Sequence, residues 1–139
     1  MNKIDSRKRF VSLWFPLLPL EAITKNRSDL DSLPLCICLA SNKDKIICTN
    51  QKAKSLGIKV GMSPKEALIL SPKAVNKMIE DLKLKKELIS FCDFIYKFTP
   101  AIRLDGYDGL ILDITGCKSF TGSEKKFSNH LITYFFRKK

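Results

Sequence analysis

The first apolar segment of the chain is a predicted strand that has no partner close to it in the sequence. Residues 9–15 (RFVSLWF) have the composition of a short buried strand, and Pro16 ends it because proline cannot donate to a sheet ladder. Residues 101–104 and 109–115 form a predicted hairpin about ninety residues later and are the strands available for pairing. We therefore expect an α+β fold in which an inserted lobe separates the first strand from this hairpin.

The expected domain organisation follows from that pairing. Residues 1–19 would supply the first strand, residues 20–78 the inserted lobe, and residues 79–139 a helix, the hairpin and a last helix. The lobe itself begins with a possible short helix over residues 20–30, followed by a hairpin. The predicted strands of that hairpin are residues 35–40 and 45–48, and the predicted turn between them is residues 42–44.

Two short helices in the lobe are predicted from their end signals. Asn50 is a good cap for a helix over residues 51–56, because its side chain can accept from a free backbone N–H. Ser63 and Glu66 have the spacing of a capping box, which predicts a helix over residues 64–70. Both predictions rest on local signals and require nothing of the tertiary structure.

A longer amphipathic helix is predicted over residues 79–96. Leu84, Leu88, Phe91 and Ile95 recur at helical spacing and form one apolar stripe. The last predicted helix covers residues 125–136, after the capping pattern Thr121-x-x-Glu124.

The net charge suggests a polyanionic partner. Of 139 residues, 25 are Lys or Arg and 14 are Asp or Glu, which gives a net charge of +11. Such an excess attracts nucleic acid, although a bias toward lysine across the whole chain explains part of it. No apolar run approaches the length of a membrane span. The five cysteines include no C-x-x-C pair, and His130 is the single histidine, so we expect reduced thiols, no zinc site and a cytoplasmic location.

Four stretches of the sequence, in the right order and spacing, resemble the Y-family DNA polymerases of the UmuC/DinB type. They are LWFPLLPLE, ICTNQKAKSLGIKVGMSPKEALILSP, YKFTPAIRLDGYDGLILDITGC and FTGSE, and the last of these is typical of the ImuB-like branch. The resemblance covers residues 10–136. It implies an antiparallel palm sheet packed on helices and a fingers-like lobe. A thumb and a little finger are expected to be absent, which makes the chain an amino-terminal fragment.

The resemblance also implies where a metal site would lie. The family transfers nucleotides with two Mg²⁺ ions held by two Asp and one Glu. Trp14 stands at the first Asp position, Gly109 at the Glu position, and Asp108 alone keeps its carboxylate. Two divalent ions about 4 Å apart repel by about 4 kcal/mol even in water, so one carboxylate does not offset the repulsion. We expect no catalytic residue, no bound metal and no enzymatic activity.

Residues that contact nucleotide and DNA in the family are only partly kept. Gln51 stands at the Tyr position and Lys54 at the Arg position of the fingers, where lysine keeps the charge and loses the bidentate fork. Lys52, Lys59 and Lys65 complete, with Lys54, the expected DNA-binding set. These residues predict weak, non-specific DNA binding and no small-molecule substrate.

The favoured function is that of a truncated, inactive Y-family polymerase-like protein linked to DNA repair and translesion synthesis. Other repair or replication proteins are further candidate partners, and no membrane is expected. One alternative is a minimal nucleotidyl transferase that uses Asp105, Asp108 or Asp113. Another is a basic protein-interaction module, whose surface would be an exposed strand edge and an exposed apolar palm face. The same alternative includes a decayed remnant with no DNA-directed activity.

Overall fold

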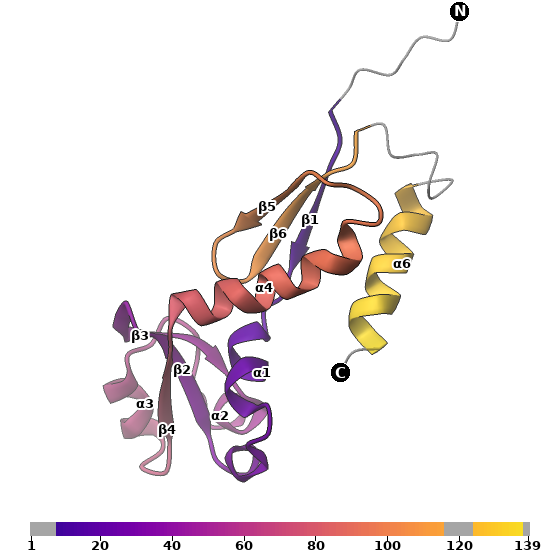
Figure 1. Cartoon of the computed structure of the whole chain (residues 1–139). Helices are drawn as coiled ribbons and strands as arrows, with labels where there is room; N and C mark the ends of the chain where they lie inside the picture. The colour runs from indigo at the N-terminus through magenta and orange to yellow at the C-terminus, as the bar shows by residue number, and fades with distance from the viewer. Residues whose placement is uncertain (1–7, 116–123, 138–139) are drawn as a thin grey trace, which may run out of the picture. The chain divides into compact units, whose positions relative to one another are not determined.

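The computed structural model describes residues 8–115 and 124–137. The chain divides into two compact units (Figure 1). The split unit combines the segment up to Trp14 with the segment from Leu88 onward, and the inserted unit is Phe15–Glu87. The sequence places these boundaries after residues 19 and 78, whereas the contacts within the structure place them after Trp14 and Glu87.

The split unit contains a three-stranded antiparallel sheet with the order β1-β6-β5. Strand β1 pairs with β6 from Phe10 opposite Asp113 to Trp14 opposite Gly109. The predicted pairing of the first strand with the late hairpin is therefore confirmed. The three strands are β1 (Phe10–Trp14), β5 (Ile102–Asp105) and β6 (Gly109–Asp113).

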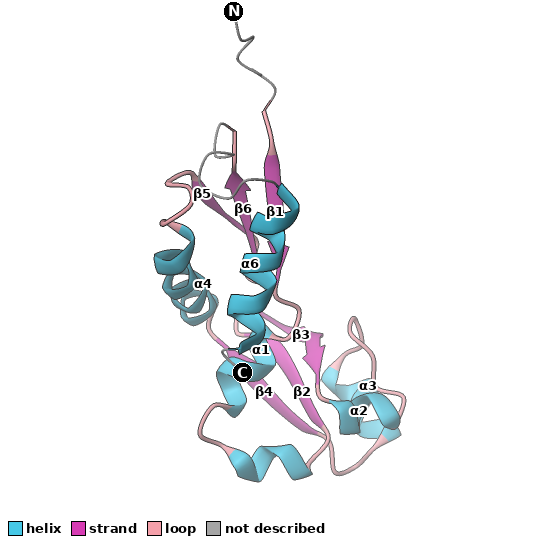
Figure 2. Cartoon of the chain, turned by 90° about the vertical axis from the view of Figure 1, so that its right-hand side faces the viewer, coloured by secondary structure: helices cyan, strands magenta, loops and turns pink. Residues whose placement is uncertain are grey.

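Two helices cover one face of this sheet (Figure 2). They are α4 (Asp81–Ile95), of which the part from Leu88 belongs to the split unit, and α6 (Glu124–Arg137). Phe94 of α4 stacks on Tyr134 of α6 with ring centroids 3.6 Å apart. Beneath the helices, Leu110 and Leu112 of β6 are fully buried, and so are Leu84, Leu88 and Ile95 of the predicted stripe on α4.

The other face of the sheet, which we call the open face, is not covered by a helix in the described part of the split unit (Figure 2). It carries side chains that alternate with the buried ones, and β1 contributes Phe10, Ser12 and Trp14 to it. Phe10 is 58% exposed and Trp14 is 71% exposed. The prediction of a short buried strand over residues 9–15 is therefore wrong for this face of β1. The segment is apolar on both faces, and helices pack against only one of them.

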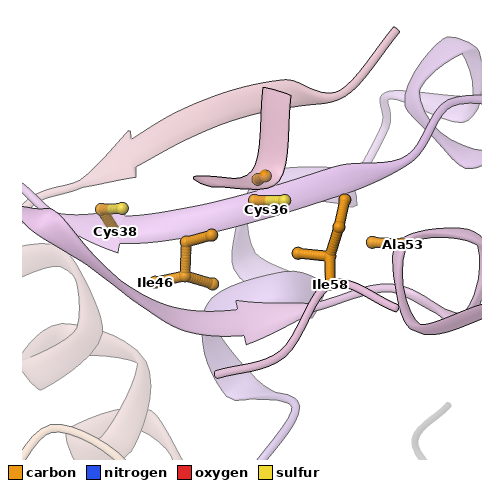
Figure 3. Packing of buried hydrophobic residues seen from close by; sticks show 6 residues of the cluster. Cys36, Cys38, Ile46, Ala53 and Ile58 are labelled. Atoms are coloured by element: carbon orange, nitrogen blue, oxygen red, sulfur yellow. The ribbon is translucent and has the colours of Figure 1, made fainter. Parts of the chain in front are cut away.

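The inserted unit contains a mixed sheet with the order β3-β2-β4, in which β2 pairs antiparallel to β3 and parallel to β4. Cys36 and Cys38 of β2 point toward one core, together with Ile46, Ala53 and Ile58 (Figure 3). Burial raises the pKa of the Cys36 thiol to about 11. The elements are α1 (Leu18–Thr24), a 3-10 helix (Ser28–Ser32), β2 (Leu35–Leu39), β3 (Asn42–Thr49), α2 (Gln51–Ser55), α3 (Pro64–Leu70) and β4 (Val75–Ile79).

The helix ends predicted from capping residues agree with the structure of this unit. Helix α3 covers the predicted residues, and the capping box of Ser63 and Glu66 is present with both hydrogen bonds. The predicted helix over residues 20–30 is interrupted instead. Asn26 adopts a left-handed backbone with φ of 65°, which ends α1 and separates it from the 3-10 helix.

Two features of the mixed sheet differ from the prediction. The hairpin turn lies at residues 40–41, because the polar residues Asn42 and Asp44 extend β3 rather than form the turn. Strand β4 was not predicted, and it includes Ile79, the residue at which the long helix was expected to begin. Thr121 and Cys117 lie outside the described residues. Within the described ranges, none of the helices is long and apolar enough to cross a membrane.

Candidate functional site

The structure brings together the three residues at the expected metal position. Trp14 lies directly opposite Gly109 in the pairing of β1 with β6. The indole Nε1 of Trp14 donates a hydrogen bond to Oδ2 of Asp108 at 3.1 Å. Residues 94 positions apart in sequence therefore meet at the hairpin end of the open face. A hydrogen-bonded pair of side chains therefore lies where the sequence resemblance led us to expect a metal site.

The donor set at this position does not fit a pair of divalent cations. An indole N–H only donates hydrogen bonds and offers no lone pair to a metal. Gly109 has no side chain, and a Cβ there would lie 2.8 Å from the carbonyl oxygen of Asp105. Asp108 is left as one carboxylate, and the described part of the chain contains no group of three His, Cys, Asp or Glu residues placed to hold a metal ion.

The other two acidic residues of the hairpin do not complete the site. Asp113 lies at the far end of β6 from Gly109, roughly 13 Å along the strand. Its Oδ1 accepts from the backbone N–H of Thr115 at 3.0 Å, and the hydrogen bonds from Thr115 lower the pKa of Asp113. Asp105 ends β5 opposite Gly109. For the alternative that uses Asp105, Asp108 or Asp113, Asp113 lies apart from the other two, and the described residues contain no acidic centre of three such groups.

The expected nucleotide- and DNA-binding residues lie in the inserted unit. Gln51 and Lys54 are exposed on α2, one turn apart, and the cap Asn50 fixes the start of that helix. Lys52 is exposed, but its Nζ donates to the carbonyl oxygen of Ser32 at 2.6 Å. Lys59 and Lys65 are also exposed, on the turn after α2 and on α3. The helices that carry these lysines pack on one core, through Ala53 and Ala67.

Sequence reasoning expected an exposed apolar palm face but did not identify its residues, and it missed the exposed apolar side chains of α3. Ile69 of α3 is 81% exposed, beside the exposed Leu68 and Leu70. On the open face the missed residues are Phe10 and Trp14. In the strand FVSLW, alternate side chains point to opposite faces, and both faces carry apolar residues. This pattern could have suggested that one apolar face of the strand is exposed.

The fold is that of the Y-family DNA polymerases. A post-insertion binary complex of Dbh DNA polymerase superimposes with a TM-score of 0.74 at 16% identity, over 93% of this chain and 38% of that chain. DinB from Sulfolobus solfataricus has a TM-score of 0.70 at 16% identity, over 94% of this chain and 39% of that chain. A chimeric chain described as a Y-family DNA polymerase has a TM-score of 0.71 at 18% identity.

A family model assigns the chain more closely. The model of the impB/mucB/samB family matches residues 14–135, and the chain belongs to that family. The protein ImuB from two strains of Caulobacter vibrioides is 33% identical over 82 residues, which are 59% of this chain. That match spans 18% of the ImuB chain, and the solved polymerases are matched over less than half of their length.

These comparisons correct one expectation and confirm others. The resemblance to the Y family and the expected α+β palm-and-fingers architecture are confirmed. The expectation that the chain is not an enzyme is contradicted, because the chain belongs to the impB/mucB/samB family and has the fold of an enzyme family, the Y-family DNA polymerases. The reason for the error is that the substitutions at Trp14 and Gly109 describe one site, whereas the class is set by the whole fold.

Proposed function

We propose that the chain supplies DNA-binding palm and fingers surfaces to a protein of DNA repair and translesion synthesis. The observation that carries the proposal is the match over 93% of the chain to a DNA polymerase in a binary complex. The similarity to ImuB and the net charge of +11 support it further. The proposed partner is DNA, held weakly and without sequence preference, in company with other repair or replication proteins.

The charges of the inserted unit support DNA as the ligand. Residues 50–78 contain six lysines and a single carboxylate, Glu66, which is held by the backbone N–H of Ser63 at 2.7 Å. Lys54, Lys59 and Lys65 are exposed on this stretch. Lysines of this kind neutralise phosphates without reading bases, so they support affinity and not sequence choice.

Neutralising two of these lysines is expected to weaken duplex binding and flatten its salt dependence. Each phosphate contact contributes about 0.9 to the slope of log K against log salt, so Lys54→Gln with Lys59→Gln should reduce the slope by about 1.8. The slope is measured by fluorescence anisotropy of a labelled duplex across a salt series. The matched control is Lys85→Gln with Lys86→Gln on α4. An equal reduction in both double variants would contradict the proposed surface.

We also propose that Trp14, Asp108 and Gly109 hold no Mg²⁺ pair. The proposal is supported by the hydrogen bond between the indole and the carboxylate, which occupies the expected ligand position. Trp14→Asp removes the indole and adds a second carboxylate beside Asp108, on an exposed position. We expect it to bind Mn²⁺ on the order of tenfold more tightly than the parent chain, measured by electron paramagnetic resonance titration. Trp14→Asn is the uncharged control, and tight Mn²⁺ binding by the parent would contradict the proposal.

The exposed apolar residues of α3 favour a second candidate function, a protein-interaction module. Ile69 is 81% exposed to solvent on α3, the helix that also carries Lys65. Single exposed apolar residues are common, but neighbouring ones mark contact sites. Ile69→Glu should then abolish co-purification of one stoichiometric repair or replication protein while leaving duplex binding within about twofold of the parent. Unchanged co-purification would contradict this candidate.

A further inference from the structure

The open face of the split unit carries two exposed aromatic rings on one strand. Phe10 and Trp14 lie on the same side of β1, four residues and roughly 13 Å apart. Their exposed fractions are 58% and 71%. Ser12, the residue between them on this face, is small and leaves the space between the rings open. The lysines proposed to bind DNA belong to the inserted unit, and the two rings belong to the split unit.

The side chain of Trp14 is oriented by a hydrogen bond, which suits it to stack on a flat ligand. Its indole Nε1 is fixed to Asp108 at 3.1 Å, which ties one edge of the ring. Gly109 lies opposite Trp14 on β6 and has no side chain to cover the ring. A ring that is already ordered loses little conformational freedom on binding, so its contact surface is used efficiently.

The charges on this face favour contact with bases over contact with phosphates. Arg103 of β5 is exposed and lies two strands from β1. It is in the same cross-strand row as Ser12, with Ile111 of β6 between them, and this row falls between those of Phe10 and Trp14. Asp105 and Asp113 also lie on the face, and Lys8 is close enough to Asp113 to lower its pKa. With Asp108, which bonds the indole of Trp14, the face carries three carboxylates against these two cations, although the net charge of the whole chain is +11. One cation between two rings suits a single phosphate flanked by two bases.

We propose that Phe10 and Trp14 form a stacking platform for unpaired bases of single-stranded nucleic acid, with Arg103 contacting the phosphate between them. A duplex buries the faces of its bases in the stack, whereas a single strand presents them to aromatic side chains. The inference rests on the proposed DNA-binding function and adds to it the contact residues of the split unit and a ligand class.

The composition of the chain provides a direct measurement. Trp14 is its single tryptophan, so the intrinsic tryptophan fluorescence reports this residue alone. We expect saturable quenching when the full chain is titrated with oligothymidylate, and little quenching with a blunt-ended duplex hairpin. Because stacking is screened less than phosphate contacts, the quenching amplitude at saturation should persist at raised salt.

Variants separate stacking from general apolar contact. Phe10→Ala and Phe10→Leu should both weaken oligothymidylate binding roughly tenfold, since leucine keeps apolar area and has no ring. Trp14→Phe should retain most of the affinity in an anisotropy assay, and Trp14→Ala should lose roughly tenfold. Tyr96→Ala is the matched control, because Tyr96 is 55% exposed and follows α4 rather than β1. It should bind as the parent does.

Several outcomes would overturn the inference. Bound oligothymidylate without quenching would place the single strand elsewhere, and equal quenching by duplex would remove the requirement for unpaired bases. Stronger quenching by an oligolysine peptide than by oligothymidylate would assign the face to a basic protein segment. If duplex still binds through Lys54 and Lys59 while quenching is absent, the proposed function stands and this inference falls. If neither nucleic acid binds, both fall.

Discussion

Replacing Asn50 with alanine is expected to lower the free energy of unfolding by about 2–4 kcal/mol, as measured by urea denaturation followed by circular dichroism. The Asn50 Oδ1 accepts from the backbone N–H groups of Ala53 and Leu35, both at 3.0 Å. Its Nδ2 donates to the carbonyl oxygen of Leu33 at 2.7 Å. Alanine removes a helix cap and leaves two partly buried backbone groups without partners.

Aspartate at position 50 is the informative control. Asn50→Asp keeps the oxygen that caps α2 and accepts from Leu35, and it loses only the donor to Leu33. We expect it to retain about half or more of the stability that alanine loses. Since Gln51 and Lys54 follow this cap on α2, Asn50→Ala should also weaken duplex binding. A loss below about 1 kcal/mol for Asn50→Ala would show that water replaces these hydrogen bonds.

Replacing Gly109 with glutamate, the residue type that the family resemblance places there, is expected to destabilise the chain by about 1–3 kcal/mol. A Cβ at this position would lie 2.8 Å from the carbonyl oxygen of Asp105 and 3.3 Å from that of Leu13. Both atoms belong to the backbone of neighbouring strands, so they cannot move aside by a change of rotamer. The measurement is the shift of the urea midpoint at constant slope.

Two variants isolate the cause of this loss. Gly109→Ala should lose nearly as much as Gly109→Glu, because the conflict arises at Cβ and not at the charge. Trp14→Asp restores the other acidic position on an exposed side chain and should change stability by less than about 1 kcal/mol. If Gly109→Ala were neutral and Gly109→Glu costly, repulsion from Asp105 and Asp108 would be the cause instead.

The sequence predicted the fold best where short-range chemistry determines the structure. The capping box at Ser63 and the cap at Asn50 fix α3 and α2 within one residue, because the partner atoms lie within the same turn. The pairing of β1 with the late hairpin was also predictable, since no other partner was available nearby. Strand β4 was missed because its parallel pairing with β2 depends on a contact across the unit.

The sequence predicted which residues lie together at the site, but not the contacts between them. The resemblance placed Trp14, Asp108 and Gly109 at one position, and the structure brings them together. That the indole would bind the carboxylate, and that Gly109 leaves no space for a side chain, depends on the distance between strands. The exposure of Trp14 could not be predicted either, because an apolar residue in a strand does not reveal which face the helices cover.

Strand β1 can pair only after β6 has been synthesised, because β6 is its partner in the sheet. Residues 15–87 form one continuous segment that can fold as soon as it leaves the exit tunnel, whereas β1 waits until β6 has been translated. At typical elongation rates, that interval lasts about 5–20 seconds. During this interval the nascent chain exposes an apolar segment, which is the kind of surface that chaperones bind. Codons that slow translation before β6 would lengthen this period of vulnerability.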